Sequence, residues 1–262
     1  MTPILSYDTY CDGLARSITD KCWWIDKLDD TIDTVVDLGC GEGSVIQMVG
    51  ETCRFRRLIG VEPNDELRRR ASDKNPDAEF VKNLGELYSI PQIDGGVAVC
   101  VINSVCHEIL TYEGAIAFHN LLLELDKIGF KYIAIRDMCM PDRGFDRMDL
   151  FSNDNLPKWI MEEWIDFRIE WEKNPIYRNY TYKQALLEFL LKYNYRDNWE
   201  REKAERYLWY WHNSAEVYLG ADYYIDYNST FSIPQQQRRI RRDFGVDVAQ
   251  LHTHRKMLFT RK

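Results

Sequence analysis

The first half of the chain alternates short apolar runs with stretches of helical periodicity. Five runs are nearly continuous in apolar side chains, and they lie at residues 34–38, 58–61, 78–81, 97–102 and 132–135. Helical patterns begin between them, at residues 44–50, 63–71 and 113–128. Strands that are apolar on both faces and separated by helices are typical of a parallel sheet that is covered on both sides. We therefore predict an α/β fold with a doubly wound, mostly parallel sheet.

The pattern changes after the fifth run, where residues 153–220 show only helical signals. One face of a predicted helix carries four large apolar side chains, Ile160, Trp164, Phe167 and Trp171. Thr181 is typical of a helix N-cap. Asp197 and Glu200 have the spacing of a capping box, which predicts a helix that runs to about Trp211. We expect this block to be an insertion between the fifth and sixth strands of one sheet.

The last forty residues return to strand patterns. Residues 223–231 and 256–260 are predicted strands, and a helix over 235–244 begins after Pro234 and ends at Gly245. The sheet is therefore expected to have seven strands. We expect three units along the chain: a core over 1–152, a helical insertion over 153–221, and C-terminal strands with a basic helix over 222–262 that complete the core.

Composition narrows the class of protein. The chain has 262 residues, of which 45% are hydrophobic and 29% charged, as in ordinary globular proteins. No apolar run approaches the roughly 18 residues that a membrane span needs, and no signal peptide is visible, so no membrane partner is expected. Seven cysteines without a CxxC pair indicate reduced thiols and predict a cytoplasmic protein. The net charge is −8, yet residues 235–262 hold eight Lys/Arg and two Asp/Glu.

A glycine-rich segment carries the main chemical signal. Asp37-Leu38-Gly39-Cys40-Gly41-Glu42-Gly43 directly follows the first predicted strand and precedes a helix. Alternating glycines let the chain turn sharply and let a ligand lie against bare backbone, beside the free N–H groups of a helix start. A dinucleotide fingerprint would need glycine at position 44, where this chain has Ser44. The acidic-x-Gly-x-Gly-x-Gly spacing resembles the first motif of class I S-adenosylmethionine-dependent methyltransferases.

The resemblance covers about residues 33–138, and it implies a Rossmann-like sheet, a methyltransferase activity and S-adenosylmethionine as cofactor. It further implies that Glu62, at the end of the second strand, accepts hydrogen bonds from the ribose hydroxyls, and that Asn83 and Leu84 contact the adenine ring. The expected cofactor-binding residues are Asp37, Gly39, Cys40, Gly41, Glu62, Asn83, Leu84 and Asn103. The core over 1–152 would then bind the cofactor, and the insertion over 153–221 would cover the acceptor site.

The ends of the fourth and fifth strands supply the candidates for the acceptor side. Ligands of doubly wound sheets bind beyond the carboxyl ends of the strands. His107, Glu108 and Asp137 follow those ends, and we regard them as the candidate catalytic residues. The alternatives are a packed core histidine at 107 and a surface ion pair between Arg136 and Asp137. No group of His, Cys and carboxylate residues has metal-ligand spacing, so no metal is expected.

The sequence gives less information about the acceptor. The Asn/Asp-Pro-Pro-aromatic motif of exocyclic-amine methyltransferases and the Pro-Cys pair of cytosine-C5 enzymes are both missing. The aromatic cluster over 207–211 can stack bases or line an apolar pocket. In the basic helix Arg238, Arg241 and Arg242 share one side and form a candidate phosphate-binding face, unless they dock back onto the acidic first half. RNA or a nucleotide is the expected acceptor; the alternatives are a small molecule, and a non-catalytic S-adenosylmethionine-binding or scaffold protein.

Overall fold

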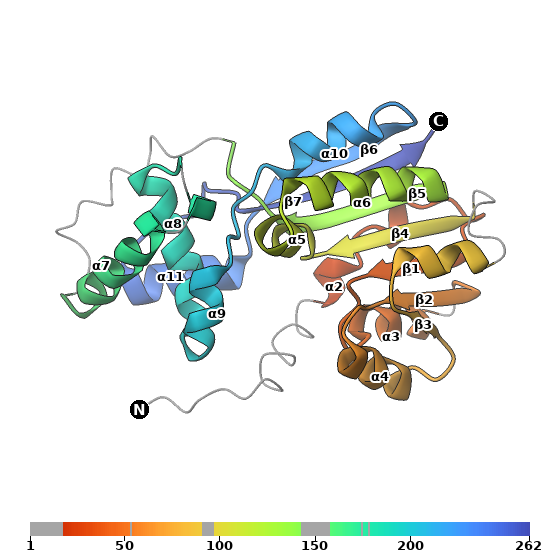
Figure 1. Ribbon diagram of the computed structural model, residues 1–262, viewed down its shortest axis with the longest axis horizontal. Helices are drawn as coiled ribbons and strands as arrows, with labels where there is room; N and C mark the ends of the chain where they lie inside the picture. The colour runs from red at the N-terminus through yellow and green to blue at the C-terminus, as the bar shows by residue number, and fades with distance from the viewer. Residues whose placement is uncertain (1–17, 53, 91–96, 143–157, 174, 178) are drawn as a thin grey trace.

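A computed structural model describes residues 18–52, 54–90, 97–142, 158–173, 175–177 and 179–262. Its sheet has the order β3-β2-β1-β4-β5-β7-β6 (Figure 1). The strands are β1 (Thr34–Leu38), β2 (Arg57–Val61), β3 (Glu79–Val81), β4 (Ala98–Asn103), β5 (Tyr132–Met138), β6 (Tyr223–Phe231) and β7 (His254–Arg261). The first five pair in parallel, and β7 runs antiparallel to both of its neighbours. The predicted fold class, a mostly parallel seven-stranded sheet, is confirmed.

Helices cover both faces of this sheet. They are α2 (Ile18–Lys21), α3 (Ser44–Glu51), α4 (Asp65–Lys74), α5 (Cys106–Tyr112), α6 (Ala115–Ile128) and α10 (Trp211–Leu219). Neighbouring strand residues alternate between the two sides: Val35 packs in one core cluster with α3, and Val36 in another with α6 and α10. Because both clusters are buried, the central strands read as continuous apolar runs.

A second group of helices forms a lobe at the carboxyl end of the parallel strands, where β4 leads into α5 (Figure 1). We call this group the helical lobe; it comprises α7 (Lys158–Lys173), α8 (Tyr182–Lys192), α9 (Trp199–Ala204) and α11 (Pro234–Phe244). The predicted apolar face of α7 is buried here, and Thr181 caps α8 in a complete capping box. The predicted helix after Pro234 forms and ends at Gly245.

The helical lobe includes a helix, α11, that lies outside the predicted insertion. Ile240 and Phe244 of α11 lie in the same buried cluster as the apolar faces of α7 and α8. Conversely, α10 belongs to the predicted insertion but packs against α6, which covers the sheet. Trp211 and Leu219 of α10 lie in the cluster that covers β4. The division of the chain at residues 153, 221 and 222 stays a prediction.

One predicted helix differs from the structure. α9 begins after Asn198 without a side-chain cap from the predicted capping box and ends at Ala204, and residues 205–210 form no helix or strand before α10 begins. Two buried side chains of α8 cause this. The Glu188 carboxylate accepts the backbone N–H groups of Tyr207 and Leu208, and the Lys192 ammonium donates to the carbonyls of Glu202 and Glu205. These bonds satisfy backbone groups that a helix would otherwise pair, so tertiary contacts override the local pattern.

Candidate functional site

The glycine loop joins β1 to α3, and all three of its glycines have positive φ: 71° at Gly39, 54° at Gly41 and 74° at Gly43. A Cβ on Gly39 would lie 2.5 Å from Val105, and one on Gly43 would lie 2.6 Å from Asn75. At Gly41 a Cβ would meet nothing within 4 Å. Packing therefore requires glycine at two positions, whereas the backbone at Gly41 borders open space.

Glu62 lies against this loop, as the sequence predicts. One carboxylate oxygen accepts the Gly41 N–H at 3.0 Å and the other accepts the Asn64 N–H at 2.9 Å. The side chain is 7% exposed. A carboxylate oxygen can accept more than one hydrogen bond, so both oxygens keep capacity for a ligand while the loop holds them in place.

Two other predicted residues of the loop are buried beneath it. Asp37, at the end of β1, is 2% exposed. Burial raises the pKa of Asp37 to about 7, although the positive charge of Lys21 acts in the opposite direction. The Cys40 thiol lies against β2, since a Cβ on Gly60 would come within 2.7 Å of its Sγ. Burial raises the pKa of Cys40 far above its ordinary value, so this thiol stays protonated.

The predicted adenine contacts occupy two different environments. Asn83 is exposed and its amide donates to Glu86 at 3.3 Å. Leu84 is 5% exposed and packs in the cluster that covers β4. Their contact with an adenine ring stays a prediction.

Asn103 ends β4 and carries an unpaired amide. The residue is 8% exposed, and neither Oδ1 nor Nδ2 has a hydrogen-bond partner among the described residues. Ser104 follows with φ 60°, its N–H donating to the carbonyl of Arg136 on β5. Buried side-chain amides are nearly always hydrogen-bonded, so the Asn103 amide has capacity for a polar atom of a ligand.

The structure brings two of the three candidate catalytic residues into direct contact. The Asp137 carboxylate lies 2.6 Å from His107 Nδ1 and also accepts the His107 backbone N–H at 3.1 Å. Both side chains are almost completely buried. Burial alone would lower the pKa of His107, but the carboxylates of Asp137 and Glu205 raise it well above its ordinary value. Arg136 does not pair with Asp137; its guanidinium binds Asp20 at 2.6 Å.

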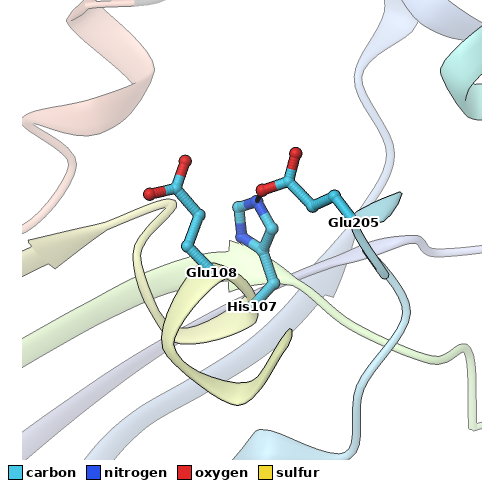
Figure 2. A group of neighbouring side chains, drawn as sticks. All are labelled: His107, Glu108 and Glu205. Carbon is cyan, nitrogen blue, oxygen red and sulfur yellow. Dashed lines mark ion pairs between the residues drawn. The ribbon is translucent and has the colours of Figure 1, made fainter. Parts of the chain in front are cut away.

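Glu205 is the member of this group that the sequence did not reveal. Its Oε1 lies 3.4 Å from His107 Nε2, and its side chain is 2% exposed. Figure 2 shows His107 and Glu108 on the first turn of α5, with Glu205 approaching from the segment after α9. Glu108 is half-buried and binds Arg201 at 3.0 Å. We call His107, Glu108 and Glu205 the α5 cluster.

The predicted phosphate-binding side of α11 is exposed. Arg238, Arg241 and Arg242 are on the surface, whereas Arg239 turns into the helical lobe and donates to the carbonyls of α8. These arginines and Gln235 line one surface hollow. We call Arg238, Arg241 and Arg242 the α11 arginine face.

The basic segment also docks back in part, through β7 rather than through α11. Arg255 pairs with Asp142 and Lys256 pairs with Asp20. On α11, Arg242 pairs with the adjacent Asp243. In the part of the chain that the structure describes, no helix is long and apolar enough to cross a membrane.

Comparison with known proteins agrees with the fold and the loop. Residues 36–122 match the family model of a methyltransferase domain, and no curated protein matches the chain. The plantazolicin methyltransferase BamL, crystallised with a desmethyl-plantazolicin analogue and SAH, is 13% identical over 97% of this chain and 88% of its own, with a TM-score of 0.54. The plantazolicin methyltransferase BpumL is 12% identical over 95% and 84%, with a TM-score of 0.50. The resemblance that the glycine loop indicated is thus confirmed.

Proposed function

We propose that this chain, whose residues 36–122 match the family model of a methyltransferase domain, transfers a methyl group from S-adenosylmethionine. The observation that carries the proposal is the contact between the Glu62 carboxylate and the Gly41 N–H at the open side of the glycine loop. The loop sequence, the sheet order and the position of this acid support a donor site at the carboxyl ends of the parallel strands.

The residues present fit the donor. Gly41 offers bare backbone beside open space, Glu62 has two fixed acceptor oxygens for two ribose hydroxyls, and Asn103 has a buried amide without a partner among the described residues. When bound, S-adenosylmethionine supplies an activated methyl group on a sulfonium. The chain then has to hold the acceptor in line with that group and exclude water, a task that depends on position more than on acid–base chemistry.

On the acceptor side we propose roles for His107, Glu108 and Asp137. Asp137 fixes Nδ1 of the imidazole, so it is a positioning residue, and Nε2, which the raised pKa of His107 keeps protonated, is the nitrogen left to face a ligand. Glu205 adds a carboxylate on the Nε2 side, and one carboxylate oxygen of Glu108 lies within 4.8 Å of the other two ligand atoms. A base is needed only if the acceptor loses its proton during transfer.

RNA or a nucleotide is the acceptor that we propose first. The α11 arginine face supports it, because three exposed guanidiniums on one side of a helix can bind several phosphates. A polynucleotide could contact this face and still reach the ends of β4 and β5. The near-complete burial of His107 and Glu205 favours a small acceptor instead, so a small-molecule methyltransferase is the second candidate.

One assay tests these proposals together. Purified protein is titrated with S-adenosylmethionine in a calorimeter and then incubated with methyl-labelled donor and cell extract split into RNA, protein and small-molecule fractions. We expect donor binding and label in the RNA fraction. Label in small molecules alone would select the second candidate, and donor binding without transfer to any fraction would indicate a binding or scaffold protein. Failure to bind the donor would refute the proposed function.

A further inference from the structure

We infer that the α5 cluster is a binding site for a divalent first-row transition-metal ion such as Mn²⁺ or Zn²⁺. One nitrogen of His107 and one carboxylate oxygen each from Glu108 and Glu205 lie within 4.8 Å of one another. Two ligand atoms on a tetrahedral ion with bonds of about 2.0–2.2 Å are roughly 3.3–3.6 Å apart. His107 Nε2 and Glu205 Oε1 already have this separation, 3.4 Å, and the farthest pair of the three atoms has to close by at most roughly 1.5 Å to share an ion.

The imidazole is held as metal-binding histidines usually are. A ligating histidine commonly donates its second ring N–H to a carboxylate, which fixes the tautomer and the ring orientation. Asp137, which is completely buried, does this at 2.6 Å from Nδ1. The free nitrogen, Nε2, is then directed at Glu205, as Figure 2 shows.

Glu205 provides an independent sign of a ligand. Its Oε1 is buried and has no hydrogen-bond partner among the described residues. The 3.4 Å to His107 Nε2 is an ion-pair distance rather than a good hydrogen bond. The protonated imidazole faces Oε1 only at this distance, and an ion that takes the place of the Nε2 proton would bond to both atoms.

The charges around the cluster favour a cation. Three carboxylates, those of Asp137, Glu108 and Glu205, surround the imidazole. The guanidinium of Arg201 lies at their outer side, 3.0 Å from Glu108 and 3.8 Å from Glu205. Arg201 and the protonated imidazole carry two positive charges against three negative ones, and a divalent ion that displaces the imidazole proton would balance the set. A mixed set of one imidazole and two carboxylates suits Mn²⁺ or Zn²⁺ better than Mg²⁺, which favours oxygen ligands alone.

The fold holds Glu205 in this place. The segment that carries it is tied to α8 through Glu188 and Lys192, and Tyr207 packs edge-on against the His107 ring with 5.5 Å between ring centroids. Resting on the proposed function, an ion here would stand beside the end of β4, where the acceptor is expected. It would bind a hydroxyl oxygen of the acceptor and lower the pKa of that hydroxyl, whose proton would pass to water, so we infer a hydroxyl-bearing acceptor.

The test measures ion binding without the methyl donor. Wild type is treated with a chelator and titrated with Mn²⁺, with free Mn²⁺ followed by electron paramagnetic resonance, and Zn²⁺ binding is measured by calorimetry. We expect one site in the wild type, at least tenfold weaker binding in Glu108→Gln and Glu205→Gln, and partial rescue in Glu205→Asp. Glu200→Gln is the matched control, since it removes an exposed carboxylate from α9.

Two results would overturn the inference: no stoichiometric binding of either ion to wild type, or wild-type affinity in both glutamine variants. Circular dichroism and S-adenosylmethionine affinity report folding, because the donor site uses Gly41 and Glu62 and not the α5 cluster. If a glutamine variant does not fold, Glu205→Asp decides the question. Weaker Mn²⁺ binding than in wild type supports the site, and wild-type affinity counts against it. Ion binding without donor binding would refute the proposed function and leave the ion site standing. Donor binding without ion binding would refute the ion site and leave the proposed function standing.

Discussion

Glu62→Gln is the most direct perturbation of the proposed donor site. The carboxylate uses one oxygen for the Gly41 N–H and the other for the Asn64 N–H. Glutamine keeps the shape but replaces one acceptor oxygen with an NH2 group. One backbone N–H then faces a donor, and one ribose hydroxyl loses its acceptor.

The expected loss of affinity follows from the number of hydrogen bonds to the ligand that the substitution removes. A hydrogen bond to a charged group contributes roughly 1.5–3 kcal/mol, and the substitution removes about one such bond to the ligand. At about 1.4 kcal/mol per tenfold change, the affinity for S-adenosylmethionine is expected to fall roughly 10- to 100-fold. The fold should be retained, because the one backbone N–H that loses its acceptor, of Gly41 or of Asn64, is not buried and can bond to water.

Calorimetric titration of wild type and variant checks this expectation. Glu79→Gln is the matched control: it removes a carboxylate from the neighbouring strand β3, where Glu79 pairs with Arg57 at 2.6 Å in an exposed ion pair. The control should bind the donor as wild type does. A Glu62→Gln protein that is folded and has wild-type affinity would refute the assignment of this carboxylate to the ribose.

Three further predictions address the loop, the buried acid beneath it and the basic helix. Gly41→Ala is expected to weaken donor binding and Gly245→Ala is not, although both place a Cβ in open space at positive φ, 54° and 71°; equal affinities by calorimetry would argue against the loop. Burial raises the pKa of Asp37 from an ordinary 3.8 to about 7. Between about pH 4 and 7 the folded chain therefore keeps a proton that the unfolded chain has released, so Asp37 lowers the free energy of unfolding as the pH rises through this range. Asp37→Asn should remove that decline in urea unfolding, and an unchanged slope would contradict the burial argument. Changing the α11 arginine face to glutamine should flatten the slope of log K against log salt for a single-stranded RNA by about 2, at roughly 0.7 per phosphate contact; absence of RNA binding by wild type at low salt would leave the small acceptor.

The donor half of the site could be predicted because local rules fix it. A glycine loop between a buried strand and a helix must lie at the carboxyl end of that strand, and an acid at the end of the next strand must lie beside it. Gly41 and Glu62 meet as these rules require. The parallel pairing of β4 with β5 likewise brings His107 near Asp137, although the sequence placed them only at the same edge.

The acceptor half could not be predicted, because a long-range interaction determines the course of the chain there. The spacing around Glu200 favours a helix through residue 205, and a helix would have made Glu205 one more charged surface position. Instead, Glu188 and Lys192 of α8 bind the backbone of this segment and keep it out of a helix. Both are charged residues on a helix that reads as amphipathic, and nothing in the local pattern shows that they are completely buried.

This difference between the halves bears on how the site works. The donor residues all belong to the sheet domain and its loops, so they are in place whatever the helical lobe does. The α5 cluster is complete only when the segment that carries Glu205 lies against α5, a contact held by the Lys192 and Glu188 bonds within the helical lobe and by Arg201 bound to Glu108. Under the proposed function we therefore infer that the lobe supplies part of the acceptor site and does not only cover it, because a carboxylate from the lobe completes the group of side chains around His107.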